Sequence, residues 1–322
     1  MDIAQIRALV AGEMTEVDRL IERRLHSEVA LVNQVSQYII QSGGKRLRPI
    51  LVLLGARAFN CVESSRIDLA AIIEFIHTAT LMHDDVVDAS ALRRGHDTAN
   101  AIWGNEASVL VGDFLYSRAF QMMVSVGSMR IMEIMAETTN VIAEGEVLQL
   151  LNCHEPDTTE EQYLTVIRSK TAKLFEASGR IGPVLAGVST AQEEALATYG
   201  RHLGTAYQLV DDVLDYRGSS DEIGKNVGDD LAEGKPTLPL IFTIANGTPA
   251  QAGAVRTAIE TGGRDDIETV VDAVESAGAI TYTARAAQTE AGLAMEALDQ
   301  VPASSAKDAL IALADFSVSR TF

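Results

Sequence analysis

The sequence predicts an all-α protein, a single large bundle of about ten or more helices. Three observations favour this class. Apolar residues recur at spacings of three and four along most of the 322-residue chain, which is typical of amphipathic helices. Alternating runs and Asn-Gly or Asp-Gly turns are scarce, so strand signals are weak. Only seven prolines interrupt the chain, which leaves room for long helices. We expect one domain over residues 1–322, because no stretch has the composition of a flexible linker.

The elements follow from local pattern. Residues 17–40 carry apolar side chains near four-residue spacing, and residues 69–88 are predicted to form one long buried helix. The segment that begins at Thr158 opens with a capping-type Thr and Glu pair. Further helices are expected over 108–126, 130–151, 158–179 and the Ala-rich tail from Thr248, and loops over 42–49, 93–105, 153–159 and 217–239.

Composition excludes several classes of function. The net charge is −19, which repels nucleic acid. Cys61 and Cys153 are too few for a disulfide framework and form no CxxC pair, as expected for a reducing cytoplasm. The N-terminal segment is acidic and lacks a signal-peptide core. No apolar run approaches about 18 residues, so we expect no transmembrane segment.

Two acidic clusters stand within apolar helical runs. In "HDDVVD", Asp84 and Asp88 lie one helical turn apart, and Asp211 and Asp215 repeat the spacing in "DDVLD". Asp85 and Asp212 project about 100° to the side. Buried carboxylates are costly unless compensated, and Mg²⁺ prefers such oxygen ligands together with substrate phosphates. The alternatives are a solvated acidic helix end and a dinuclear iron site, but the iron site needs Glu-x-x-His pairs that are missing here.

Lysine and arginine gather near the acidic clusters although they total only 26. Basic groups in an acidic protein are anion sites, and arginine suits phosphate oxygens. Neither Gly-Lys stretch fits a nucleotide-binding P-loop. The combination predicts two bound diphosphates, one held through metal and one by cations directly. The cations are Lys45, Arg46, Arg48, Arg93, Arg94, Lys170, Lys173, Lys225 and Lys235.

The motifs "GGKRLRP", "EFIHTATLMHDDVVD", "LRRG", "GNEASVLVGDFLYSRAF", "EGEVLQL", "KTAKLFEAS", "YQLVDDVLDY" and "GKNVGDDLAEGKPTLPL" occur in this order between Gly43 and Leu240. With them the chain resembles the trans-polyprenyl diphosphate synthase family, and within it the bacterial octaprenyl diphosphate synthases that serve quinone side-chain synthesis. The resemblance implies an isoprenoid synthase bundle around a central cavity and a homodimer. It also implies a prenyltransferase that condenses an allylic diphosphate, such as farnesyl diphosphate, with isopentenyl diphosphate.

The resemblance also implies roles for individual residues. About three Mg²⁺ ions per active site are expected, with Asp84, Asp88 and Asp211 as direct ligands and Asp85, Asp212 and Asp215 acting through water. The catalytic set implied is Asp84, Asp85, Asp88, Arg93, Lys170, Asp211, Asp212 and Lys225. The isopentenyl diphosphate pocket implied is Lys45, Arg48, His77 and Arg94, and the allylic diphosphate side is Arg93, Lys170, Thr171, Gln208, Lys225 and Lys235.

The expected mechanism is ionisation, condensation and elimination. Metal and cations neutralise charge on the leaving diphosphate, the double bond of isopentenyl diphosphate attacks the allylic cation, and a proton leaves. Thr171 and Gln208 offer oxygen dipoles to the cation. Growth requires an apolar tunnel, expected to pass Ala79 and Thr80 and, one turn deeper, Ile76. Ala79 is small, which predicts a long product. Met123 and Met135 are candidates for the tunnel floor, with plain core methionines as the alternative.

Several alternatives stay open. The product could have another chain length, although octaprenyl is favoured. A non-catalytic regulatory homologue would be expected to lack a carboxylate or a diphosphate cation, and none is missing. A terpene cyclase commonly keeps one aspartate-rich motif, whereas this chain has two. Because the product is strongly hydrophobic, peripheral contact of the protein with a membrane during product release is also possible.

Overall fold

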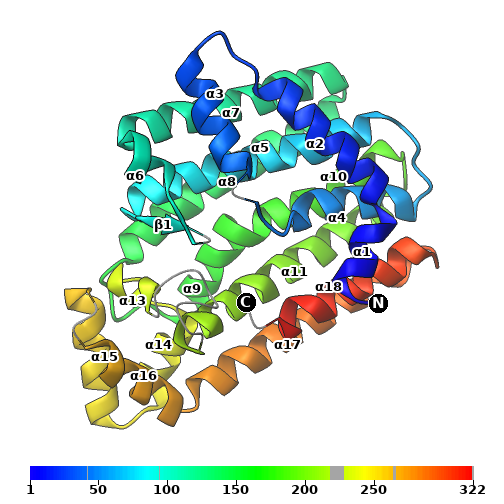
Figure 1. Ribbon diagram of the computed structural model, residues 1–322. Helices are drawn as coiled ribbons and strands as arrows, with labels where there is room; N and C mark the ends of the chain where they lie inside the picture. Colours follow the sequence, from blue (N-terminus) through cyan, green and yellow to red (C-terminus); the bar gives the residue numbers. More distant parts are fainter. Residues whose placement is uncertain (42, 94, 218–227, 264–265, 321–322) are drawn as a thin grey trace. The chain divides into compact units, whose positions relative to one another are not determined.

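The computed structural model describes residues 1–41, 43–93, 95–217, 228–263 and 266–320 (Figure 1). The structure is 81% helical, with almost no strands among the described residues, which confirms the all-α prediction. The helices are α1 (Ile3–Leu9), α2 (Ala11–Leu25), α3 (Ala30–Gln41), α4 (Leu47–Ala58), α5 (Ser65–Val87), α6 (Ala99–Trp103), α7 (Asn105–Val126), α8 (Met129–Asn152), α9 (Glu160–Ile167), α10 (Lys173–Leu185), α11 (Thr190–Arg217), α13 (Asp229–Ala232), α14 (Leu238–Asn246), α15 (Pro249–Thr261), α16 (Ile267–Ser276), α17 (Ala279–Ala297) and α18 (Ser305–Ser319). A π-helical turn η1 (Arg168–Ala172), a 3₁₀ turn η2 (Leu298–Gln300) and the strands β1 (Leu92–Arg93) and β2 (His96–Asp97) complete the described elements.

The chain forms two compact units. The first comprises Met1–Glu137, Leu174–Gly200 and Ala297–Leu313, and the second comprises Thr138–Lys173, Arg201–Glu296 and Ala314–Phe322. The boundaries fall inside helices and not in linkers. That residues 1–322 act as one domain therefore stays a prediction.

The first unit is built around α5. Its middle is mostly apolar, and Ile72, Ile73 and Phe75 are fully buried. A helix whose apolar side chains point in several directions must be covered on several faces, and α5 packs against α7, α4 and α2 (Figure 1). Burial continues as far as Met82 and lessens in the last turn of α5, where Asp84 is half-buried and Val87 is exposed. The predicted long buried helix over 69–88 is therefore confirmed.

The second unit has two apolar clusters. One joins Val213 and Tyr216 of α11 to side chains of α13–α17, including Val255 and Val274. The other joins Tyr163 of α9 to Leu209 of α11, together with side chains of α14 and α17. Both clusters lie under the second acidic motif, because α11 contributes the residues on either side of its aspartates. The second motif is thus anchored by ordinary apolar burial.

One periodic stretch forms two helices, and one predicted loop needs correction. The periodic stretch over 17–40 is broken between α2 and α3, because the Asn33 side chain accepts from the Ser27 N–H (2.9 Å) and donates to the Ser27 carbonyl (2.7 Å). This local bonding competes with helix continuation. The predicted loop over 93–105 contains the antiparallel pair Arg93↔His96 and the short helix α6.

The other junctions agree with the pattern more closely. Residues 153–159 are a connection between α8 and α9, as predicted. At the start of α9, Thr159 is the N-cap, and its capping-box partner is Gln162 in place of the expected glutamate.

Candidate active site

The first acidic motif occupies the last turn of α5. Asp88 is the C-cap, and its N–H donates to the Asp84 carbonyl at 2.8 Å, so the helical turn between the two residues is intact. Asp84 and Asp88 therefore project from one face, as their spacing predicts. Both are half-buried, whereas Asp85 is buried. The structure thus separates the two predicted direct ligands from the predicted indirect one.

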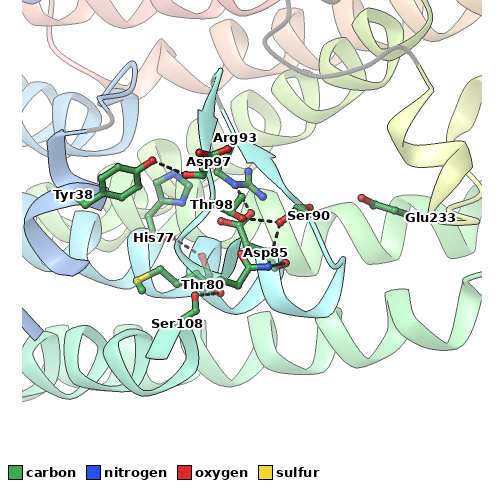
Figure 2. A network of polar contacts seen from close by, with 12 residues as sticks. Tyr38, His77, Thr80, Asp85, Ser90, Arg93, Asp97, Thr98, Ser108 and Glu233 are labelled. Atoms are coloured by element: carbon green, nitrogen blue, oxygen red, sulfur yellow. Dashed lines mark hydrogen bonds and ion pairs between the residues drawn. The ribbon is translucent and has the colours of Figure 1, made fainter. Parts of the chain in front are cut away.

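Asp85 anchors the hairpin that follows α5. Its Oδ1 accepts from Arg93 Nε at 2.6 Å, and its carbonyl accepts from Ser90 N–H and Asn100 Nδ2 (Figure 2). Thr98 Oγ1 also donates to the Ser90 carbonyl, at 2.7 Å. A carboxylate that is 2% exposed needs such a partner. Asp85 therefore holds Arg93 beside the acidic motif, and the structure brings these two predicted residues together.

Arg48 and His77 meet in the first unit. Arg48 Nη1 lies 3.1 Å from His77 Nε2. A guanidinium only donates, so Nε2 accepts and the proton of a neutral His77 is on Nδ1. The Arg48 guanidinium also lies 4.2 Å from the centre of the Phe175 ring. Two predicted pocket residues are thus adjacent, and Phe175 is a supporting residue that the sequence analysis missed.

A second ion pair joins the same elements. Arg46, which precedes α4 with φ of 53°, binds buried Glu74 of α5 at 2.6 Å. Glu74 stands three residues before His77, on the same face of α5. The contacts Arg46–Glu74 and Arg48–His77 therefore both connect the start of α4 to α5. The "GGKRLRP" motif predicted Arg46 as an anion-binding cation but did not indicate its ion pair with Glu74. Lys45, also predicted, is half-buried in the segment before α4.

In the second unit, η1 presents Lys170 and Thr171. Lys170 Nζ lies 2.7 Å from Glu146 Oε2 and 2.6 Å from Gln149 Oε1, both on α8. Thr171 Oγ1 donates to Gln208 Oε1 at 3.0 Å. A π-turn inside a helix is uncommon and is often found at functional sites. The "EGEVLQL" motif contains both α8 partners, but the sequence analysis assigned them no role.

A polar chain leads from Thr171 to the second acidic motif. Gln208 Nε2 donates to Asp212 Oδ1 at 2.9 Å, and the Tyr163 hydroxyl donates to Asp212 Oδ2. The pKa of Asp212 is raised to about 8, first by burial and then by the charge of Asp230, while the two hydrogen bonds act to lower it. Burial and the Asp212 charge likewise hold the pKa of Tyr163 well above its ordinary value. The raised pKa favours the protonated form of Asp212. A positive charge placed nearby would favour its ionised form instead.

Asp211 and Asp215 differ in their surroundings. Asp211 is 43% exposed and binds Arg320 Nη1 at 2.7 Å, while Arg320 Nη2 donates to the Tyr207 carbonyl. The Arg320 guanidinium also stacks 3.7 Å from the Tyr207 ring centre. Asp215 is buried. Arg320 is a partner of the acidic motif that no local pattern indicated, since it lies near the far end of the chain.

The remaining predicted residues are placed as follows. Lys235 is half-buried and binds Glu233 Oε2 at 2.5 Å. Arg94 and Lys225 lie outside the described residues. Thr80 is half-buried and donates to the His77 carbonyl at 2.8 Å. The other chain-length candidates are buried in the first unit: Ile76, Ala79, Met123 and Met135.

The donor set suits a divalent cation held jointly with phosphate. In the part of the chain that the structure describes, no three His, Cys, Asp or Glu side chains converge as a complete cation site. Mg²⁺ is usually bound by one or two carboxylates plus substrate phosphates. The half-buried pair Asp84 and Asp88, one turn apart, supplies such an incomplete set of hard oxygen ligands.

A helical fold with two aspartate-rich turns and separate groups of cations defines the class of prenyl diphosphate chain-elongating enzymes. The chain belongs to the polyprenyl synthetase family, which it matches over residues 29–276. Octaprenyl diphosphate synthase of Escherichia coli (strain K12) is 52% identical over 321 residues, which cover 99% of both chains. Octaprenyl diphosphate synthase of Haemophilus influenzae is 50% identical over 323 residues, covering 100% of this chain and 98% of that one.

A solved structure supports the same family and fold. The crystal structure of a polyprenyl synthase from Caulobacter crescentus CB15, complexed with calcium and isoprenyl diphosphate, is similar with a TM-score of 0.97 and 45% identity. The match covers 100% of this chain and 98% of that one. The predicted family, fold and prenyltransferase class are thereby confirmed. The assigned roles of individual residues stay predictions. Among the described residues, no helix is long and apolar enough to cross a membrane.

Proposed function

We propose that the protein is an all-trans octaprenyl diphosphate synthase that elongates an allylic diphosphate with isopentenyl diphosphate for quinone side chains. The observation that carries the proposal is the occurrence of two acidic turns together with two separate groups of cations, Arg48 and Arg93 in the first unit and Lys170 and Lys235 in the second. The full-length identity to octaprenyl diphosphate synthases supports the product length. A polyprenyl synthase of another chain length is the alternative, since small changes in a tunnel change where growth stops.

The cofactor proposed is Mg²⁺, about three ions per active site, with Asp84, Asp88 and Asp211 as ligands. Bound there, Mg²⁺ would neutralise charge on the leaving diphosphate. The calcium in the related structure supports a divalent-cation site. Asp211 must exchange its bond to Arg320 for the cation. Positive charge beside Asp212 would also lower the pKa of its carboxyl and favour the ionised form.

The chain's own groups divide the remaining work. Arg48 and His77 would bind isopentenyl diphosphate with Lys45 and Arg94, because the Arg48–His77 contact and the Phe175 ring fix the guanidinium in one orientation. Arg93, held by Asp85, would face the allylic diphosphate. Lys170 and Lys235, together with Lys225 outside the described residues, would also bind the allylic diphosphate. Thr171 and Gln208 would direct oxygen dipoles at the allylic cation. The protein thus binds two anions and leaves the proton to the departing diphosphate.

A homodimer is proposed as the working assembly. Four apolar side chains on α8 are exposed by 39–71% and share spacings of one, three and four residues. A contiguous exposed apolar face on a helix favours a protein partner. Sedimentation should give two copies. A monomer at micromolar concentration would contradict this. The four residues are Val147, Leu148, Leu150 and Leu151.

One assay tests the proposal. The purified protein is incubated with farnesyl diphosphate, labelled isopentenyl diphosphate and Mg²⁺, and the dephosphorylated products are separated by reverse-phase chromatography. Octaprenol is expected as the main product. A main product of another length would support the alternative, and no elongation at all would overturn the proposed activity. Omitting farnesyl diphosphate controls for contaminating primer.

A further inference from the structure

The connection between α8 and α9 holds a histidine that the reaction described above does not use. His154 has a φ of 63°, a left-handed conformation that few non-glycine residues adopt. Its main-chain N–H donates to the Gly234 carbonyl at 2.8 Å. Its ring Nδ1 lies 2.9 Å from the Ile259 carbonyl, 105 residues away. A carbonyl only accepts, so Nδ1 carries a proton and donates.

The imidazole ring fits between two glycines. A Cβ atom added at Gly234 would lie 2.4 Å from Nδ1, and one added at Gly262 would lie 2.9 Å from Cε1. Both glycines have positive φ, 70° and 65°. The ring therefore occupies space that any other residue at these positions would need. Although His154 as a whole is exposed, its Nδ1 edge is enclosed by these contacts.

The segment that the ring contacts carries Lys235. This residue lies in the non-helical stretch between α13 and α14, where its N–H donates to the Asp230 carbonyl at 2.8 Å. The Gly263 N–H, just beyond α15, donates to the Ala232 carbonyl at 3.1 Å. His154 thus fastens the residue directly before Lys235 to the α8–α9 connection and, through Ile259, to the last turn of α15.

We propose that His154 is a positioning residue that sets where Lys235 meets the allylic diphosphate. The inference rests on the proposed function, in which Lys235 binds that diphosphate. A lysine is a flexible point charge, so its contribution depends on where its backbone is held. His154 does not touch substrate in this proposal; it acts through Gly234. Loss of its ring should therefore weaken binding of the allylic substrate and leave binding of isopentenyl diphosphate unaffected.

The test compares His154→Ala with His154→Asn. Asparagine tolerates positive φ and offers an amide N–H near the place of Nδ1. With farnesyl diphosphate as the varied substrate, His154→Ala should raise KM about five- to tenfold, the size of one lost hydrogen bond with some loosening. His154→Asn should recover most of this loss. KM for isopentenyl diphosphate should stay within about twofold in both variants.

Asp157→Ala is the matched control, because Asp157 lies in the same connection and also reaches α15, through an ion pair with Arg256 at 2.7 Å. It should leave both KM values unchanged. Lys235→Ala should raise KM for farnesyl diphosphate at least as much as His154→Ala. Thermal melting of each variant shows whether the fold is retained.

The possible outcomes distinguish a failure of the proposed function from a failure of the positioning role. An inactive wild-type protein would overturn the proposed function itself. In an active protein, the positioning role is wrong if His154→Ala leaves KM for farnesyl diphosphate unchanged, or raises both KM values equally. It is also wrong if Lys235→Ala has no effect on the allylic substrate, or if His154→Asn behaves like His154→Ala at the same melting temperature.

Discussion

Phe175 shows how an apolar residue can serve a charged one. Its side chain is buried, and its ring lies under the Arg48 guanidinium, which also contacts His77. A cation over an aromatic face gains about 0.5–2 kcal/mol, depending on how far it is desolvated. The ring thereby limits the orientations that Arg48 can take before a diphosphate arrives.

We predict that Phe175→Leu raises KM for isopentenyl diphosphate about threefold to thirtyfold, because leucine stays apolar and fills most of the space but has no aromatic face for the guanidinium. KM for farnesyl diphosphate should change little. The control is Phe242→Leu, since Phe242 belongs to the second unit and stacks on Tyr282. Steady-state titration of each substrate measures the difference. An equal effect of both substitutions on isopentenyl diphosphate would refute the role of the ring.

Glu290 links three helical segments of the second unit. His202 Nδ1 on α11 donates to Glu290 Oε2 at 2.5 Å, and Arg168 of η1 lies 3.3 Å from Oε1. Burial by itself would raise the pKa of Glu290, but the His202 hydrogen bond and the Arg168 charge outweigh it and leave the pKa lowered. The ionised form therefore stabilises the fold above the unfolded-state pKa, and this contribution is lost as pH falls through the lower folded-state pKa.

We predict that Glu290→Gln lowers the free energy of unfolding at pH 7 by about 1–2 kcal/mol, a value reduced because Arg168 is half-exposed. The gap to the wild type should close as pH falls below about 4. Urea denaturation across pH measures it. The control is Glu260→Gln on an exposed site, expected within about 0.5 kcal/mol of the wild type. A gap that persists unchanged to pH 3 would contradict the linkage.

At the scale of elements, the π-turn η1 depends on a close approach by α8. A Cβ atom added at Gly145 would lie 2.8 Å from the Lys170 nitrogen and 2.8 Å from the Ser169 Cβ. Only glycine lets α8 come this near to the turn that presents Lys170 and Thr171. The same helix supplies Glu146 and Gln149 to the Lys170 ammonium.

We predict that Gly145→Ala displaces the turn, lowers the melting temperature and raises KM for farnesyl diphosphate about tenfold or more. Helix propensity alone would favour alanine by about 1 kcal/mol. Gly292→Ala on α17 is therefore the matched control, because nothing lies within 4 Å of its added Cβ. It should melt at the same or a higher temperature. Equal behaviour of the two variants would show that the contact is not restrictive.

The helix α5 carries the prediction about product length. Ala79 is fully buried one turn before Asp84, and Met123 of α7 and Met135 of α8 are also buried in the first unit. We expect Ala79→Tyr to shorten the product, because a ring there would block chain growth. Met123→Ala or Met135→Ala should lengthen it at a stability cost of about 2–5 kcal/mol. Reverse-phase chromatography of the dephosphorylated products is the measurement, and an unchanged product from Ala79→Tyr would exclude a tunnel along α5.

At the scale of the whole molecule, the proposed function requires both acidic motifs for turnover. We predict that Asp84→Ala or Asp211→Ala lowers kcat about 10³-fold or more. Each substitution removes a ligand of the metal ions that neutralise charge on the leaving diphosphate. The fold should survive, because removing one of several clustered carboxylates relieves repulsion. Circular dichroism checks the fold and single-turnover assays check the rate. Wild-type turnover that persists in excess EDTA would exclude a metal role.

Some features are local, and the sequence by itself determined them. The helices and the one-turn spacing of Asp84 and Asp88 follow from periodicity within a few residues. A threonine cap before α9 was also predictable from side-chain chemistry, although the structure uses Thr159 with Gln162 in place of the expected Thr and Glu pair. The family motifs likewise identified the class of enzyme before any contact was known. Each of these depends on neighbours in the chain, so no fold is needed to read it.

Other features were decided only by tertiary structure. Tyr163 donates to Asp212 across 49 residues, His154 reaches Ile259 across 105, and Arg320 pairs with Asp211 near the far end of the chain. The π-turn at Lys170 has the same apolar pattern as an α-helix, so periodicity could not reveal it. Such contacts arise because burial leaves a charged or polar group to find a partner among whatever elements pack beside it. That choice depends on how distant helices meet, which a one-dimensional pattern does not contain.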